Sequence, residues 1–266
     1  MIVLSYGMLK SGSTLAFELC KSILVNRGFV QRRLPDGLIL KKIHSINFFE
    51  EITLAALEKA LEEVRPTEFI AIKTHAGLRP PELHVIEDAV AEGRMKVQVN
   101  LRDPREMALS LVDAGANARA KMRQAFSEIV QLADAVRIVE RQLSVCRTWG
   151  SIRGVMYSHY NEVAFDTPAA VRQMCDYLGL KMFKEDELPR VIDPVFNEAF
   201  TQCNKAVKDR YKDDLTVRQN EFLLEAIKLA RPFIRRVLEQ RDYSWFTPAR
   251  ERDAGLATTP ALAAVK

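Results

Sequence analysis

The sequence has few cysteines, no long apolar run and almost no excess of charge. Its four cysteines lie far apart, at Cys20, Cys146, Cys175 and Cys203, without the spacing of a metal site or of a disulfide framework, so we expect reduced thiols. No run approaches the ~20 apolar residues of a membrane span. Met1 leads directly into an apolar run rather than a basic, cleavable leader. We therefore expect a cytoplasmic protein without a membrane partner.

The charge balance excludes a nucleic-acid coat. Lysine and arginine number 39 against 35 aspartates and glutamates, a net charge of +4 over 266 residues. That excess is too small for a nucleic-acid-binding surface but leaves room for a local basic pocket. A hydrophobic content of 48% supports a sizeable core. We predict one α/β domain over residues 1–246 and a disordered tail over residues 247–266, where alanine, threonine, proline and charged residues dominate.

The most informative stretch lies close to the N-terminus. Residues 2–4 are an apolar run that predicts a strand, and Leu15, Leu19 and Ile23 repeat at helical spacing. Between them lies a loop that contains Gly7, Lys10 and Gly12. A strand, a glycine loop and a helix N-terminus in this order form an anion-binding site, because backbone amides and the helix dipole favour negative charge. The expected ligand is a phosphate or sulfate group.

This loop departs from the nucleotide-binding pattern that it most resembles. The Walker A loop has glycine, four residues, glycine, lysine and then serine or threonine, so that the lysine reaches the terminal phosphates and the hydroxyl binds magnesium. Gly7 and Gly12 have that spacing, but Ser13 stands in place of the lysine, and Lys10 lies inside the loop. An isolated string of this kind also suits a surface turn, and it is the flanking strand and helix that favour an anion site.

Two further predicted strands end in polar residues. The apolar run 69–72 leads into Lys73 and His75, which lie two apart on an extended chain and so point the same way. A single histidine at a strand end is more often structural than catalytic, so His75 needs support from its neighbours. The run 95–101 leads into Arg102, which is well placed to bind a phosphate. Open α/β sheets bind ligands at this carboxyl edge.

A capping motif follows Arg102. Asp103 suits the N-cap of a helix, Pro104 its first position, and Glu106 completes a pattern like a capping box. Asp103 could also be read as a Walker B aspartate, but capping already explains it. We predict one long helix from Met107 to about Leu143, in which the basic residues 119–123 form a solvated face.

The remaining segments alternate between predicted strands and helices. We predict helices over residues 52–64 and 167–178, a strand over 154–157, a loop over 183–211, and a last helix that begins at Thr216 and continues to Val237. The fold class is therefore α/β, a single doubly wound and mainly parallel sheet flanked by helices in three layers, as in P-loop nucleotide-binding proteins.

The motifs together resemble the sulfotransferases that use 3′-phosphoadenylyl sulfate (PAPS). The resemblance runs from the first strand to about Tyr243, and its motifs occur in the order that the family has them. It implies PAPS as co-substrate, with no metal, and His75, Lys10 and Lys73 as catalytic residues, His75 being the base. The implied donor-binding residues are Lys10, Ser11, Gly12, Ser13, Thr14 and Leu15 in the 5′-phosphosulfate loop, Arg102 and Ser110 at the 3′-phosphate, Tyr160 at adenine, and Lys205.

The chain also departs from the family pattern. Leu15 stands where a tryptophan commonly packs on adenine, and Asn204-Lys205-Ala206 stands where the family usually has Arg-Lys-Gly. A glycine and a tryptophan that follow are replaced near Asp209 and Tyr211. The motif through which cytosolic members dimerise is present, which implies a homodimer contact through Lys212, Thr216, Val217 and Glu221.

The expected reaction is transfer of a sulfuryl group to a hydroxyl or amine of a small-molecule acceptor, which the sequence does not name. Because a sulfuryl group carries less negative charge than a phosphoryl group, Lys10 and Lys73 could suffice without magnesium. Two alternatives remain at this stage. One is a P-loop kinase that transfers phosphate from ATP, and the other is a non-catalytic nucleotide-binding protein of the same fold.

Overall fold

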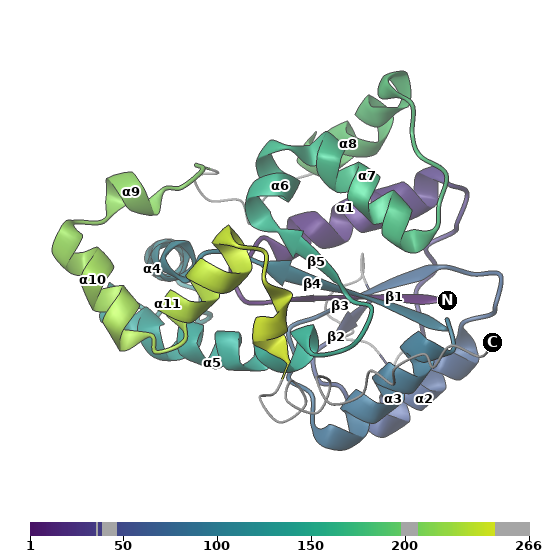
Figure 1. Ribbon diagram of the computed structural model, residues 1–266, viewed down its shortest axis with the longest axis horizontal. Helices are drawn as coiled ribbons and strands as arrows, with labels where there is room; N and C mark the ends of the chain where they lie inside the picture. The colour runs from purple at the N-terminus through teal and green to yellow at the C-terminus, as the bar shows by residue number, and fades with distance from the viewer. Residues whose placement is uncertain (36, 39–46, 198–206, 248–266) are drawn as a thin grey trace, which may run out of the picture.

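A five-stranded parallel sheet forms the centre of the molecule (Figure 1). The computed structural model describes residues 1–35, 37–38, 47–197 and 207–247. Within them the strand order is β2-β3-β1-β4-β5, and every neighbouring pair is parallel. The strands are β1 (Ile2–Gly7), β2 (Phe48–Phe49), β3 (Ile70–Thr74), β4 (Met95–Leu101) and β5 (Met156–His159). The order reverses direction at β1, which places the topological switch point, where such sheets bind ligands, next to the loop that follows β1.

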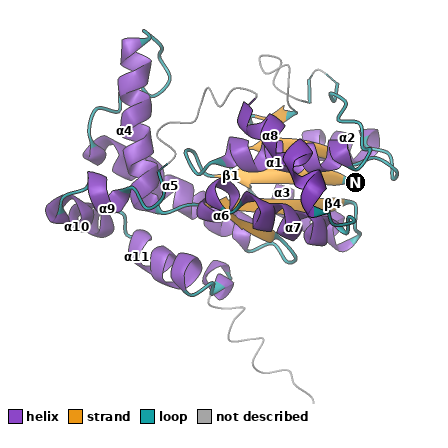
Figure 2. Cartoon of the chain, turned by 90° about the horizontal axis from the view of Figure 1, so that it is seen from above, coloured by secondary structure: helices purple, strands orange, loops and turns teal. Residues whose placement is uncertain are grey.

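Helices cover both faces of the sheet and its carboxyl edge. On one face lie α1 (Ser13–Asn26), α6 (Tyr160–Phe165), α7 (Thr167–Leu178) and α8 (Leu188–Asn197), and on the other α2 (Leu54–Glu63) and α3 (Pro80–Ala91) (Figures 1 and 2). Beyond the carboxyl ends of the strands lie α4 (Pro104–Ala120), α5 (Leu132–Gly150), α9 (Tyr211–Asp214), α10 (Val217–Ala226) and α11 (Ala230–Pro232). The architecture confirms the predicted doubly wound α/β class.

The sheet separates two hydrophobic clusters. Alternate residues of β1 point to opposite faces, so that Leu4 belongs to the cluster under α2, α3 and α5, while Val3 belongs to the cluster under α1 and α7. All six residues of β1 are buried, as expected for a central parallel strand covered on both sides. Within the described residues, none of the helices has both the length and the apolar composition that a membrane crossing requires.

The structure corrects the predicted elements at the edges of the sheet. The two-residue strand β2 was too short to show a pattern, and α3 was not among the predicted helices. Pro80 and Pro81 stand in its first turn, where proline is well suited. The predicted loop 183–211 contains α8, in which Leu188, Val191 and Val195 are buried on one stripe. Residues 248–266 of the predicted tail lie outside the described residues.

Two predicted long helices are each divided. Residues 121–131 form a loop between α4 and α5. Arg119, Lys121 and Arg123 are exposed, as predicted for a solvated face, and Arg119 near the end of α4 also donates hydrogen bonds to the carbonyl oxygens of Ser127 and Ile129, at 2.8 and 2.7 Å. The last helix ends at Ala226 and is followed by α11 and by a π-helical segment over Phe233–Glu239. Pro232 contributes to this second break, because it lacks the N–H that would continue the α-helical hydrogen bonds.

Gly115 allows the 121–131 loop to pack closely against α4. A Cβ atom at this position would lie 2.0 Å from the carbonyl oxygen of Ile129 and 2.9 Å from that of Phe126. We therefore expect Gly115→Ala to lower the free energy of unfolding by about 1–3 kcal/mol, measured by urea denaturation. Gly77→Ala is the matched control, since its Cβ would lie 3.7 Å from Val145, an ordinary contact. Equal stability of the two variants would contradict the close packing of this loop.

Candidate active site

The loop between β1 and α1 has the conformation of an anion-binding turn. Lys10 and Gly12 both have left-handed backbones, with φ of 66° and 79°. The Ser11 hydroxyl donates to the carbonyl oxygen of Met8 at 2.7 Å, which closes the turn from within. A Cβ at Gly12 would lie 2.4 Å from the ring of Tyr160, so this position requires glycine both for its φ and for its neighbour. The N-terminus of α1 at Ser13 directly follows this turn.

Lys73 lies next to this loop because β3 is paired with β1. Its Nζ donates a hydrogen bond of 2.6 Å to the hydroxyl of Thr14, in the first turn of α1. The side chain is buried, and desolvation lowers the pKa of Lys73 to about 8, partly opposed by Glu18. Lys73 is therefore still mainly protonated at pH 7, and its charge lies beside the anion-binding turn.

His75 is held by the strand that starts the loop. Its Nδ1 lies 2.5 Å from the carbonyl oxygen of Gly7. Burial, and then the charges of Lys73 and Lys10, lower the pKa of His75 to about 4, so the ring is neutral at pH 7. A carbonyl oxygen can only accept, which assigns the proton to Nδ1 and leaves the lone pair on Nε2. The ring of Phe48 packs edge-on against His75, with the centroids 5.7 Å apart.

Arg102 reaches back from β4 to the same loop. Its Nη1 donates to the carbonyl oxygen of Lys10 at 3.0 Å, and its guanidinium stacks 3.8 Å from the ring centre of Tyr160. Its Nε binds the Glu106 carboxylate at 3.0 Å, so the predicted role of Glu106 in a capping box is wrong. Asp103 alone caps α4, accepting a 2.8 Å hydrogen bond from the backbone N–H of Arg105.

The Lys10 side chain lies over α4. Burial and the charge of Arg102 lower the pKa of Lys10, and Asp113 on α4 opposes them. Its Nζ stacks 5.0 Å from the ring centre of Phe126, in the loop after α4. Lys10, Lys73 and Arg102 therefore gather around one turn of backbone, with the neutral imidazole of His75 beside them.

A known protein family covers almost the whole chain. Residues 2–237 match the family model described as the sulfotransferase domain. The chain belongs to the sulfotransferase family. It is thus an enzyme, a PAPS-dependent sulfotransferase of the kind that its motifs implied. The sequence matches no curated protein.

Two solved structures have a similar fold. Mouse sulfotransferase SULT7A1 complexed with PAP is 14% identical, with a TM-score of 0.55 over 92% of this chain and 87% of that chain. Retinol dehydratase in a complex with retinol and PAP is 16% identical, with a TM-score of 0.54 over 85% of this chain and 80% of that chain. At these identities the likeness shows the fold alone.

Other predicted site residues of the sulfotransferase lie in different surroundings. Ser110 is buried on α4, one helical turn beyond Glu106. The side chain of Leu15 is buried in the cluster between α1 and α7. Lys205 lies outside the described residues, as do His44 and Cys203. Cys20, Cys146 and Cys175 are buried free thiols.

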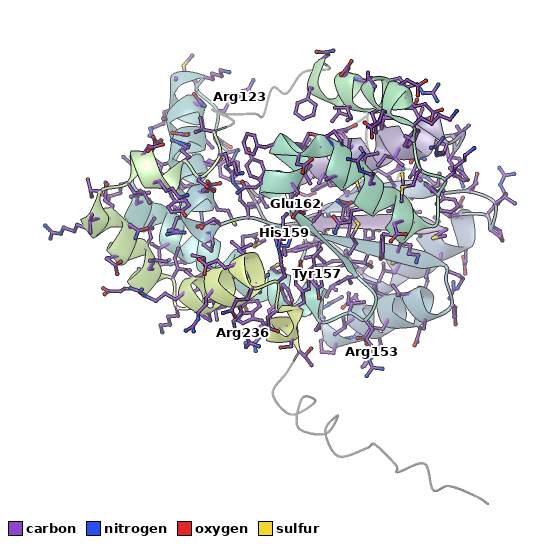
Figure 3. All side chains as sticks on the ribbon, turned by 45° about the horizontal axis from the view of Figure 1, so that its top comes forward. Arg123, Arg153, Tyr157, His159, Glu162 and Arg236 are labelled. Carbon is purple, nitrogen blue, oxygen red and sulfur yellow. The ribbon has the colours of Figure 1, made fainter. Side chains whose placement is uncertain are left out.

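A second buried histidine of the sulfotransferase, His159, is the last residue of β5, and its contacts are those of a structural residue. His159 Nε2 lies 2.8 Å from the Tyr243 hydroxyl, and Tyr243 stacks on Tyr157 with the centroids 3.9 Å apart. Burial and Arg241 lower the pKa of His159 to about 3. Figure 3 shows Tyr157, His159 and Glu162 close together along this part of the chain, and Arg123 well apart from them near the outer end of α4. The contacts of His159 attach the C-terminal segment to the sheet, as a structural histidine would.

The sequence analysis did not identify Arg210 or the ion pair between Glu106 and Arg102. Arg210 lies in the segment predicted as a loop, and its partner Asp113 is 97 residues away in the chain. No local spacing reveals a pair so distant. Glu106 lies four residues after Arg102, but Arg102 precedes the N-cap of α4, so helical spacing does not account for this pair.

Proposed function

We propose that this sulfotransferase moves the sulfuryl group from PAPS to a hydroxyl or amine of a small-molecule acceptor, with His75 as the general base. The observation that carries the proposal is the hydrogen bond from His75 Nδ1 to the Gly7 carbonyl. It leaves Nε2 unprotonated in a site that holds two lysines. A base must have a free lone pair, and a developing oxyanion needs nearby cations, and both are present here.

The donor would be held by residues at its two ends. Lys10, Ser11, Gly12, Ser13 and Thr14 would bind the 5′-phosphosulfate, since they form the anion-binding turn. Arg102 and Ser110 would bind the 3′-phosphate, with Lys205 as a further cation, and Tyr160 would lie toward adenine. Leu15, whose side chain is buried in the cluster between α1 and α7, would contribute only its backbone, at the start of α1. The Tyr160 ring stacks on the Arg102 guanidinium. The residue proposed at adenine therefore lies next to a residue proposed at the 3′-phosphate, which supports placing both ends of one nucleotide here.

In the proposed reaction an acceptor oxygen or nitrogen attacks sulfur in line with the bond to the leaving phosphate oxygen. The new bond to sulfur forms as the S–O bond to the phosphate breaks, and the acceptor proton passes to His75 Nε2. Charge grows on the bridging oxygen, which leaves with 3′-phosphoadenosine 5′-phosphate. Lys10 and Lys73 would stabilise that charge, so that the protein contributes mainly position and electrostatics.

An aromatic ring lies next to the proposed base, where the acceptor would bind. Phe48 packs against His75, which supports an acceptor whose reactive hydroxyl or amine is attached to an apolar body. Retinol and androsterone, which are bound in two solved structures of retinol dehydratase, are small apolar alcohols. A homodimer through Lys212, Thr216, Val217 and Glu221 and a cytoplasmic location are part of the same proposal, and the 83% exposure of Val217 supports the dimer contact.

The test is a comparison of two nucleotides by thermal shift. We expect 3′-phosphoadenosine 5′-phosphate to raise the melting temperature, by an amount that grows with its concentration, because it binds only the folded state. Arg102→Ala should reduce the shift strongly. Arg94→Ala should keep it, since Arg94 is an exposed residue that pairs with Glu92.

Two outcomes would point elsewhere. Stabilisation by ATP with magnesium, and none by the bisphosphate, would contradict the proposal and favour a kinase. Stabilisation by the bisphosphate with no sulfuryl transfer to any of a panel of phenols, alcohols and amines would favour a non-catalytic nucleotide-binding protein.

A further inference from the structure

The 3′-phosphate site lacks a cation that the family usually has. Asn204 stands where the family motif has arginine, so the proposed site has one cation fewer, with Arg102 and Lys205 remaining. We propose that Arg210 supplies the missing cation, as a ligand for the 3′-phosphate of the donor. This inference rests on the proposed use of PAPS, and it names a residue that neither the motifs nor the family pattern assigns.

Arg210 lies over the face of α4 that carries Ser110. Glu106, Ser110 and Asp113 are spaced at i, i+4 and i+7 and share this face. The Arg210 guanidinium binds Asp113 through Nη1 at 2.5 Å, and its backbone N–H is close enough to the Glu106 carboxylate to lower the pKa of that group, which burial otherwise raises. Arg210 is thus bound to α4 at Asp113, on one side of Ser110, and its backbone lies near Glu106 on the other, and only 6% of the residue is exposed.

The segment around Arg210 is anchored to the donor-binding elements. Asn161, next to Tyr160, donates to the Asp209 carboxylate at 3.2 Å. Tyr211 stacks under the guanidinium of Arg105, 3.6 Å from its ring centre. Asp209 has a left-handed backbone, with φ of 53°, at the place where the family glycine is replaced, so the turn survives the replacement. These contacts hold Arg210 in a defined position between the adenine segment and α4.

Arg210 and Arg102 are presented in the same way. Arg210 donates from Nε to Asp214 and from Nη1 to Asp113. Arg102 donates from Nε to Glu106 and from Nη1 to the Lys10 carbonyl oxygen. Neither Nη2 makes a hydrogen bond to another residue that the structure describes. A guanidinium whose position is set by carboxylates, and whose Nη2 hydrogens are not used in hydrogen bonds to the described residues, is suited to bind phosphate oxygens.

The experiment separates the 3′-phosphate from the rest of the nucleotide. Binding of 3′-phosphoadenosine 5′-phosphate and of 5′-AMP is measured by calorimetry for the wild type and for Arg210→Gln. We expect Arg210→Gln to lower the affinity for the bisphosphate by about 10- to 100-fold and the affinity for 5′-AMP by less than about 3-fold, because only the bisphosphate carries the 3′-phosphate. Arg172→Gln, which removes an exposed arginine paired with Glu185, should change neither.

The ratio of the two affinities decides between binding and a purely structural role. If Arg210 only attaches α9 to α4, both ligands weaken together, and an unchanged ratio overturns the inference. A wild type that does not bind the bisphosphate at all would instead overturn the proposed donor. If Arg210→Gln does not fold, Arg210→Lys is the test. A lysine keeps the charge but not the paired donors, so the ratio should fall by about 5-fold, and an unchanged ratio again overturns the inference.

Discussion

His75→Ala is expected to lower turnover by about 10²-fold or more while the enzyme still binds 3′-phosphoadenosine 5′-phosphate normally. The substitution removes the only unprotonated ring nitrogen proposed to accept the acceptor proton, and leaves the anion-binding turn in place. Turnover is measured with saturating PAPS and an acceptor that the wild type sulfates, and binding by thermal shift.

Two further variants separate proton transfer from position. His75→Asn can still donate a hydrogen bond toward the Gly7 carbonyl but cannot act as a base, so it should be as inactive as His75→Ala. His84→Ala removes an exposed histidine, near Glu87 on α3, and should be fully active. Near-normal turnover in either His75 variant would remove this residue from the role of base.

Lys73→Met is expected to lower kcat/KM by about 10²- to 10³-fold, because it removes a buried positive charge from the place where the leaving oxygen becomes negative. The control is Lys96→Met. Lys96 lies in the same sheet, on β4, with its Nζ 4.8 Å from the ring centre of Tyr177, and has no part in the proposed site. Equal losses in the two variants would indicate that the effect comes from damage to the sheet.

The same variant should change the dependence of kcat/KM on pH. In the free wild type, the base must be unprotonated and the lysine protonated, so activity should fall as the pH drops toward the His75 pKa of about 4 and as it rises through the Lys73 pKa of about 8. Lys73 lowers the pKa of His75, so its removal should raise that pKa. We therefore expect the acid limb of Lys73→Met to move to higher pH. An unmoved limb would mean that His75 does not produce it.

Local pattern was enough to predict the centre of the fold and to bring the residues of the candidate site to one edge of the sheet. The strand, turn and helix around Lys10, and the polar residues that follow β3 and β4, each depend on residues adjacent in the chain. Parallel pairing of β1 with β3 and β4 then brings Lys73 and Arg102 to the same turn. The sequence supplied the spacing, and the sheet topology required the convergence.

The features that were missed depend on distant contacts or on very short elements. β2 has two residues, and its place is set by pairing with β3 rather than by periodicity. The break after α4 depends on Arg119, whose side chain binds carbonyl groups eight and ten residues ahead. Arg210 is oriented by Asp113, which no pattern within its own segment identifies. In each case a tertiary contact overrode the local preference.

The hydrogen bond between His75 and Gly7 joins the histidine to the first residue of the turn that we propose as the donor site. Any displacement of this turn when PAPS enters or the bisphosphate leaves would carry the Gly7 carbonyl with it, and the imidazole would have to follow or lose its partner. Without that partner the proton is no longer confined to Nδ1, and the tautomer with a protonated Nε2 cannot accept another. The proposed base and the proposed donor loop therefore share one backbone group, the Gly7 carbonyl, so a substitution that displaces this loop should also change which nitrogen of His75 carries the proton.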